Sequence, residues 1–186
     1  MFRLYKRLLI QINLGKASRL LSARSASEAL SLYEKALKTD LNNTDAMIGK
    51  GRCHRSLGRH QEAIWCYDWV LAAAPGHPVA NYYKGLSLSK LGRNQEAVAC
   101  FDVSISEDPQ EHAPWQAKGM SLLVIDRLQE AVECFDAALR LGMAPDQYVQ
   151  LLERIGGKLR SLGRHQEAIR CYDRALEPYI FMEKLG

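Results

Sequence analysis

One ten-residue segment occurs twice in this chain, and looser copies of it lie between the two. The segment Arg-Ser-Leu-Gly-Arg-His-Gln-Glu-Ala-Ile spans residues 55–64 and returns unchanged at residues 160–169. Related blocks begin at Leu91 and Ile125, and the turn positions of the four blocks, 58, 92, 126 and 163, are 34, 34 and 37 residues apart. Self-similarity at this period is typical of arrays in which one small supersecondary unit stacks on the next.

Each unit contains two helical patterns separated by a tight turn. In the second unit an earlier run, residues 47–57, ends at Gly58, whose freedom at positive φ suits the position after a helix. The later run predicts a helix of about 14 residues, because its apolar residues recur three to four positions apart. Its members are Ala63, Ile64, Tyr67, Val70 and Leu71. Prolines, which cannot continue a helix, close units two to four at Pro75, Pro109 and Pro145.

These residues resemble the tetratricopeptide repeat family, whose pattern places small and aromatic residues at fixed positions of a helix–turn–helix unit. The fourth unit matches that pattern at Trp115, Gly119, Ala131, Phe135 and Ala138. The resemblance implies an all-α fold, an α-solenoid of about five stacked antiparallel helix pairs, near 10–43, 44–77, 78–111, 112–145 and 146–177. A basic segment or cap, 1–9, would precede the array, and a short tail, 178–186, would follow it.

Repeated small residues are expected to let the helices of a unit approach closely. Glycines recur on the first helix and aromatic residues on the second, where they are expected to fill the space toward the neighbouring unit. The glycines are Gly51, Gly85, Gly119 and Gly156, and the aromatic residues are Tyr67, Phe101, Phe135 and Tyr172.

The chain departs from the repeat pattern in two places. Asp126 stands where the other units have the turn glycine, and the last step carries three extra residues. We expect a longer helix that begins near Asp146, a good N-cap residue directly after Pro145, to absorb the insertion. The stacking of the last two units would then differ from that of the others.

Charge is distributed unevenly along the chain. The net charge is +4, yet residues 1–27 contain six basic residues and no acid, so the remainder is acidic with a net charge of −2. Three interpretations compete for the basic end: contact with an anionic membrane surface, organelle targeting, or the first repeat helix with its cap. We favour the cap, because the repeat register already requires a helix over residues 10–23. No apolar run approaches the ~18 residues of a membrane span.

The five cysteines do not have the spacing of a metal site. Four occupy one position of successive units, Cys66, Cys100, Cys134 and Cys171, and Cys53 is alone. Stacked repeats place equivalent atoms about 10 Å apart, whereas a disulfide needs Cα atoms within ~7 Å. We therefore expect free thiols, no metal, and a reducing compartment, most simply the cytoplasm.

Residue patterns for catalysis are also missing. The histidines occupy turns, unit junctions or helix faces with no nucleophile pattern beside them, and every glycine is explained by a turn or a packing contact. The sequence therefore predicts neither an enzyme nor a cofactor.

Binding is the function that the resemblance implies, with the first helices lining a concave groove. A partner segment with apolar anchors and some acidic residues fits the lining best. Carried over to this sequence, the groove positions are Asp45, Ile48, Arg52, Arg55, Val79, Tyr82, Leu86, Lys90, Gln116, Met120, Leu123, Glu153 and Arg160, with Tyr83 beside them. The Lys and Asn clamp of chaperone-tail-binding members is absent, because its register-matched places hold other residues, among them Ile48, Tyr83 and Ala113.

Two alternatives to groove binding remain open. Trp65 and Trp69 lie one helical turn apart and should both point outward, which would make a second interface for a partner or for homodimerisation. Nucleic acid is the other candidate, because Arg52, Arg55 and Lys90 place cations beside the rings of Tyr82 and Tyr83. The acidic balance beyond residue 27 argues against it.

Overall fold

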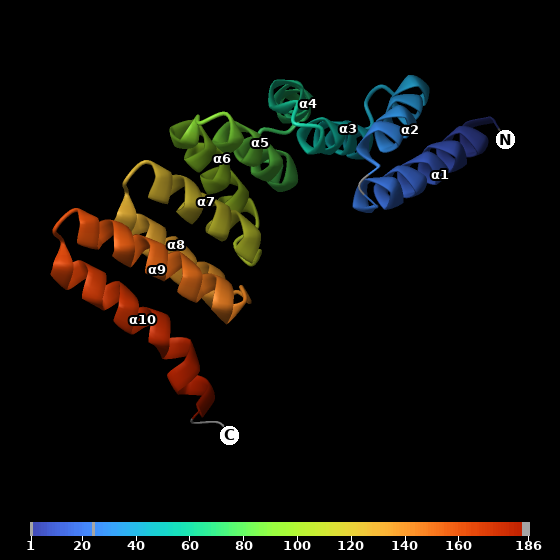
Figure 1. Cartoon of the computed structure of the whole chain (residues 1–186). Helices are drawn as coiled ribbons and strands as arrows, with labels where there is room; N and C mark the ends of the chain where they lie inside the picture. The colour runs from blue at the N-terminus through green and yellow to red at the C-terminus, as the bar shows by residue number, and fades with distance from the viewer. Residues whose placement is uncertain (1, 24, 184–186) are drawn as a thin grey trace. The chain divides into compact units, whose positions relative to one another are not determined.

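The computed structural model describes residues 2–23 and 25–183, with the side chains of residues 2–4 and 178–183 excepted. Ten helices and no strand lie in these residues, as the all-α prediction requires (Figure 1). The helices are α1 (Phe2–Ser22), α2 (Ala26–Thr39), α3 (Thr44–Ser56), α4 (His60–Ala73), α5 (Pro78–Lys90), α6 (Asn94–Glu107), α7 (His112–Val124), α8 (Leu128–Arg140), α9 (Pro145–Ser161) and α10 (His165–Glu183).

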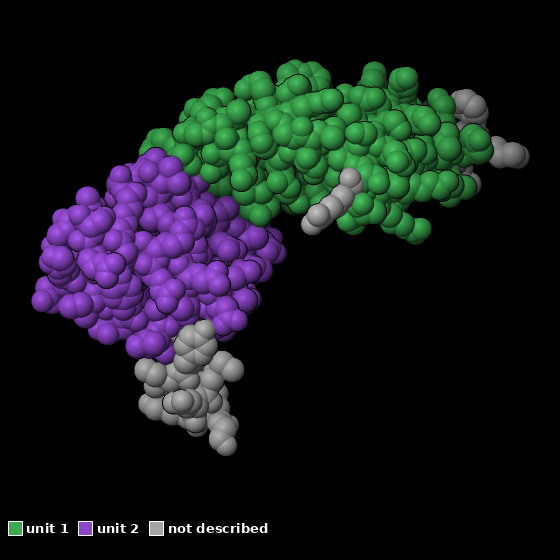
Figure 2. Space-filling view, in the orientation of Figure 1, with its two compact units in different colours: residues 1–107 green, residues 108–186 purple. Residues whose placement is uncertain are grey.

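The chain folds into two compact units: unit 1 contains residues 1–107 and unit 2 contains residues 108–186 (Figure 2). Unit 1 contains the pairs α1–α2, α3–α4 and α5–α6, and unit 2 contains α7–α8 and α9–α10. Within each unit every helix packs against its partner in the pair, and successive pairs stack on one another. Each unit is thus a run of stacked helix pairs.

The close approach of paired helices depends on the predicted glycines. A Cβ atom on Gly51 would lie 2.5 Å from Cε1 of Tyr67, and one on Gly119 would lie 2.5 Å from Cε1 of Phe135. Real Cβ atoms do not come this near, so any larger residue would push the helices apart. Tyr67 and Phe135 are both fully buried. Each ring packs against the glycine of its own pair, and Tyr67 also stacks on Tyr83 of the next pair, the direction expected from the sequence.

The first pair uses a different glycine. Gly15 of α1 has open space where its Cβ would stand, whereas the ring of Tyr33 on α2 packs directly against Gly49 of α3. Tyr33 is 4% exposed and belongs to the core of unit 1. The first aromatic residue therefore secures the contact between pairs, not the contact within its own pair.

The turn between α7 and α8 keeps its shape without a glycine. Asp126 has φ 62°, close to the φ of 74° at Gly58 in the equivalent turn. Its carboxylate forms an ion pair with Lys158 of α9. Asp is among the residues that tolerate this left-handed conformation best, so the repeat pattern can lose its glycine here.

Ion pairs join neighbouring helix pairs in unit 1. Lys50 of α3 lies 3.4 Å from Glu34 of α2, and Lys84 of α5 lies 2.6 Å from Asp68 of α4. In both cases the cation follows the carboxylate by 16 residues.

This pattern does not extend to Asp136 of unit 2. The residue directly before the packing glycine, a lysine in α3 and α5, is the fully buried Ile155 in α9. The Asp136 carboxylate instead accepts a hydrogen bond of 2.7 Å from Tyr148 of α9 and pairs with Arg174 of α10 at 3.1 Å. The pKa of Tyr148 is raised by its burial and by this carboxylate.

The insertion lengthens α9 as predicted, but the capping residue differs from the prediction. α9 has 17 residues against 13 in α7, and its N-cap is Ala144 with Pro145 as the first helical residue. Asp146 therefore lies inside the first turn, where its charge still favours the helix N-terminus. Proline suits this first position because its ring fixes φ near the helical value, and because the N–H that it lacks would have no partner there.

The described residues near both ends of the chain are helical. α1 begins at Phe2, so residues 2–9 are continuous with the first repeat helix, as the favoured interpretation of the basic segment expects. Four apolar side chains of α1 are exposed: Tyr5, Leu8, Leu9 and Ile12. α10 continues to Glu183, past the predicted start of the tail at residue 178. The tail side chains lie outside the described residues.

Candidate functional site

A hollow of about 370 Å³ lies on the first-helix side of unit 1. It is lined from α1, α2, α3 and α5 and from the turn before α5, by Gln11, Leu14, Ser18, Tyr33, Asp45, Ile48, Gly49, Arg52, His77 and Val79. Four of these residues, Asp45, Ile48, Arg52 and Val79, were assigned to the groove from sequence. The first helices of unit 1 thus bring predicted positions together around one depression.

The lining residues differ in how they can contact a partner. Asp45 and Val79 are exposed, Val79 to 44%, whereas Ile48 is only 7% exposed and belongs to the core of unit 1. Ile48 therefore forms part of the floor. The sequence prediction treated it as a groove contact equal to the others, because helical register alone does not show how deeply α3 sits between its neighbours.

A cluster of arginine and tyrosine side chains adjoins this hollow. The guanidinium carbons of Arg52 and Arg55 on α3 lie 5.1 and 5.5 Å from the ring centroid of Tyr83 on α5. Tyr83 is itself 5.1 Å from Tyr82 and 6.1 Å from Tyr67, centroid to centroid. Cations at these distances are attracted to the ring faces, so the cluster holds both guanidinium groups beside α5.

Two further predicted residues lie along the same helix. Leu86 is half-buried and Lys90, at the C-terminal end of α5, is exposed. Neither lines the hollow.

In unit 2 the predicted residues of α7 contact side chains of α9 that the sequence had not singled out. The side-chain amide of Gln116 donates to Gln147 at 3.4 Å, and Nη1 of Arg154 lies 3.7 Å from Sδ of Met120. Leu123 is buried, and its carbonyl accepts a hydrogen bond of 3.3 Å from Lys158.

The α9 residues in these contacts differ from those predicted for the last unit, which were Glu153 and Arg160. Both of these side chains are exposed. The contacts to α7 come instead from Gln147, Arg154 and Lys158.

A match to the family model for the tetratricopeptide repeat decides the family. The model matches residues 14–78, 63–112 and 117–182, which together cover most of the chain. The chain belongs to the tetratricopeptide repeat family. The resemblance noted from the sequence is thereby confirmed.

Solved structures show the same fold. MamA of Desulfovibrio magneticus, from residue 41 to its end, superposes with a TM-score of 0.75 at 20% identity and covers 91% of this chain and 94% of its own. TTC0263, a thermophilic TPR protein of Thermus thermophilus, superposes with a TM-score of 0.69 at 20% identity, covering 90% of each chain. The predicted α-solenoid of tetratricopeptide helix pairs is confirmed by this similarity.

A curated relative matches a shorter stretch. Superkiller protein 3 of Saccharomyces cerevisiae is 25% identical over 63 residues, which are 34% of this chain and 4% of that protein. The tetratricopeptide fold generally serves as a scaffold for protein–protein interaction.

The two tryptophans of this tetratricopeptide protein have different surroundings. Trp65 is 59% exposed, as predicted, but Trp69 is half-buried and packs against the core of unit 1. The expectation that both rings point outward is therefore wrong for Trp69. Its ring lines a hollow of about 590 Å³ at the end of α4, together with Asn42, Thr44, Val70, Ala72, Ala73, Ala74 and His77.

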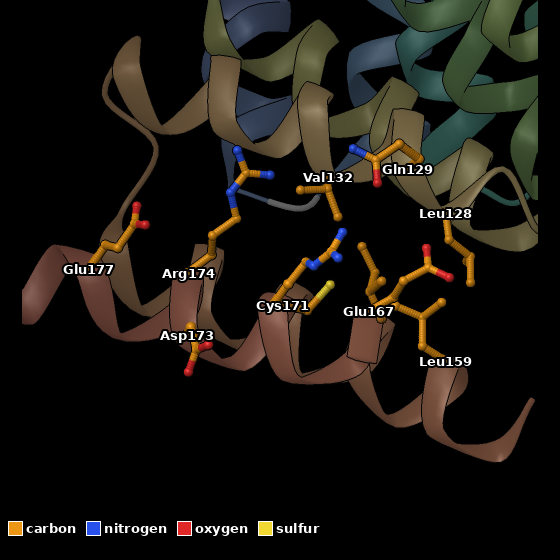
Figure 3. Close-up of a pocket in the computed structure, with 11 residues that line it drawn as sticks. Leu128, Gln129, Val132, Leu159, Glu167, Cys171, Asp173, Arg174 and Glu177 are labelled. Atoms are coloured by element: carbon orange, nitrogen blue, oxygen red, sulfur yellow. The ribbon is translucent and has the colours of Figure 1, made fainter. Parts of the chain in front are cut away.

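Sequence reasoning missed a hollow of about 410 Å³ between α8, α9 and α10 (Figure 3). Apolar side chains including Leu128, Val132 and Leu159 form part of its lining, and the sticks of Arg174 and Cys171 come from α10. α8 and α9 pack less closely than α2 with α3 or α4 with α5 of unit 1. The 37-residue step was the one available sign that packing changes here.

Cysteines of the described structure are free thiols. Burial raises the pKa of Cys53 to about 11 and that of Cys66 to about 11, so both are protonated and weakly nucleophilic near neutral pH. In the part of the chain that the structure describes, no group of three or more His, Cys, Asp or Glu side chains is arranged to hold a metal ion. Among the same residues, no helix has the length and apolar content needed to cross a bilayer.

Proposed function

We propose that this protein is a non-catalytic interaction scaffold, and that the first-helix side of unit 1 binds a segment of a partner protein. The hollow that gathers Asp45, Ile48, Arg52 and Val79 between α1, α3 and α5 is the observation that carries this proposal. A buried apolar floor with exposed polar residues around it suits a partner segment that inserts apolar side chains and forms polar contacts at the edge.

Val79 offers a direct test, because its side chain is exposed within the hollow. Val79→Glu would place a charge where a partner's apolar group would otherwise be buried, and burying an unpaired charge is strongly unfavourable. Val124→Glu is the matched control, since Val124 is 58% exposed and lies on α7 outside the hollows described above.

The experiment compares wild type and both variants, each checked for native helicity by circular dichroism. Partner proteins captured from native lysate are identified by quantitative mass spectrometry and then titrated in purified form. We expect Val79→Glu to weaken partner affinity by on the order of tenfold or more, which is at least about 1.4 kcal/mol, and Val124→Glu to leave it unchanged. Equal affinity for both variants would exclude this side of unit 1.

Homo-oligomeric assembly through α4 is the second candidate, and the exposure of Trp65 favours it. A large aromatic side chain that is 59% exposed is typical of an interface residue. Light scattering of wild type and Trp65→Ala over a range of concentrations tests this function. An oligomer that dissociates in the variant supports it, and a monomer in both excludes it.

We also propose a cytoplasmic location, because four free cysteines are buried and the fifth is half-buried, without a disulfide among them. A fusion of the whole chain to a fluorescent protein, compared with a fusion of residues 1–30 alone, distinguishes this location from organelle targeting by the basic N-terminal segment. Diffuse signal from both fusions is expected, and organelle signal from the short fusion would contradict the proposal.

A further inference from the structure

Two arginines of α3 share one aromatic ring. Arg52 and Arg55 are three residues apart, so they lie on the same face of the helix. Their guanidinium carbons are 5.1 and 5.5 Å from the centroid of Tyr83. Both side chains are half-buried, and so remain accessible from solvent.

The aromatic base under these arginines is fixed by packing. Tyr67 is fully buried and its ring is nearly parallel to that of Tyr83, at an interplanar angle of 22°. Tyr82 contacts both Tyr83 and Phe101, with centroid distances of 5.1 and 6.2 Å. Because these rings hold Tyr83 in place, the side chains that rest on it lose little conformational freedom when a ligand binds.

In the part of unit 1 that the structure describes, the charges of this cluster have no counter-ion. Among the described residues, no carboxylate lies within 4.0 Å of Arg52 or Arg55. By contrast, Lys50 of α3 and Lys84 of α5 each have an ion-pair partner. The Nε atoms of both arginines are buried without a hydrogen-bond acceptor, and the buried hydroxyl of Tyr67 also has no partner. Buried donors without acceptors are unfavourable, and two adjacent cations repel each other.

We propose that Arg52 and Arg55 form a subsite for an acidic side chain, Asp or Glu, of the bound partner segment. Arginine donates paired N–H groups in a plane, which matches the two oxygens of a carboxylate. The apolar floor of the neighbouring hollow receives the rest of the segment. This inference rests on the proposed binding to unit 1 and adds to it the chemistry that the partner must present.

Asp45 indicates why the ligand is an acidic side chain in a mixed segment and not a polyanion. Its exposed carboxylate lines the same hollow as Arg52, two helical turns away on α3. A nucleic-acid strand would bring a phosphate to each of these positions, and one of them would meet the Asp45 carboxylate. A peptide can place an acid at the arginines and an apolar or basic residue at Asp45.

Selection from a displayed library of random dodecapeptides tests the subsite. The targets are wild type, the double variant Arg52→Gln with Arg55→Gln, and a control double variant, Lys38→Gln with Arg59→Gln, which removes two exposed charges of unit 1 elsewhere. Peptides selected by wild type and by the control should be enriched in Asp and Glu over the input library. The Arg52→Gln and Arg55→Gln variant should lose that enrichment and keep the preference for apolar residues.

Synthetic peptides then measure the interaction. In a selected peptide, replacing the acidic residue with its amide should weaken binding to wild type by on the order of tenfold, and should change binding to the double variant little. Replacing it with phosphoserine distinguishes a phosphate from a carboxylate as the favoured anion. A phosphoserine peptide that binds more tightly than the acidic one would overturn the assignment to Asp or Glu.

The outcomes separate the subsite from the proposed function. If selected peptides lose affinity for Val79→Glu but show no preference for acids, unit 1 binds a segment and the subsite is wrong. If no peptide is selected, or if Val79→Glu binds as well as wild type, the proposed function fails too. Retention of single-stranded RNA at physiological salt that disappears in the Arg52→Gln and Arg55→Gln variant would also overturn the peptide assignment.

Discussion

A Cβ atom on Gly156 would lie 2.6 Å from Cε1 of Tyr172, whereas one on the adjacent Gly157 would meet no atom within 4 Å. The two glycines of α9 thus differ in role although they are neighbours. Gly156 lets α9 and α10 approach closely, and Gly157 contributes no such contact.

Gly156→Ala should lower the free energy of unfolding by about 1–3 kcal/mol, because the added methyl group forces α9 away from Tyr172. Gly157→Ala, the matched control, should raise it by up to about 1 kcal/mol through better helix propensity. Urea unfolding followed by circular dichroism measures both changes. Similar effects of the two substitutions would show that close packing at Gly156 does not stabilise this pair.

Tyr148→Phe should lower the free energy of unfolding by about 1.5–3 kcal/mol, because it removes a hydrogen bond to the Asp136 carboxylate, whose side chain is 14% exposed. Lys84→Met breaks the more exposed pair with Asp68 and should cost no more than about 1 kcal/mol. If the two losses in urea unfolding were equal, Asp136 would have no special part in joining α8, α9 and α10.

His54 should make the protein less stable in mild acid. Burial lowers the pKa of its imidazole below the usual 6.5, and the neighbouring Lys50 adds to this effect. The unfolded chain therefore binds the proton more tightly, so stability is lost as the pH falls through 6.5, and the loss is complete below the folded-state pKa. Urea midpoints between pH 8 and pH 5 should fall more steeply for wild type than for His54→Gln. A steeper fall for the variant would mean that the folded state raises this pKa.

Cys100 should be the first thiol to react with an alkylating reagent in the native protein, because it is half-buried while the other four cysteines are buried. Cys53 and Cys66, each with a pKa of about 11, should react only after local unfolding. Peptide mapping of a time course at pH 7.5 measures the order. Labelling of Cys66 before Cys100 would contradict the packing of α4.

The helix pairs could be predicted because the residues that pack against each other recur at a fixed spacing. A glycine on the first helix and an aromatic residue on the second, such as Gly119 and Phe135, repeat from pair to pair. The sequence therefore indicates both the helices and the faces that meet. The length of α9 followed from the three-residue insertion, since a helix can absorb added residues without disturbing the turns.

How far a side chain is covered by neighbouring helices, and which residue of a helix makes a given contact, could not be predicted in this way. Ile48 was expected to contact a partner and Trp69 to point outward, but the core of unit 1 covers much of each side chain. Arg154 and Lys158 contact α7, whereas the family pattern selected Glu153 and Arg160 of the same helix. That no described carboxylate pairs with Arg52 also depends on side chains from several helices.

Binding on the first-helix side of unit 1 is tested most directly by photo-crosslinking. A photoreactive phenylalanine derivative is placed at Val79 in one variant and at Trp65 in another, and the crosslinked peptides are identified by mass spectrometry. We predict that the partner crosslinks through position 79 and not through position 65, with the crosslinked partner segment carrying an acidic residue close to the attachment point. Crosslinks from position 65 alone, whether to another protein or to a second copy of this chain, would contradict the account.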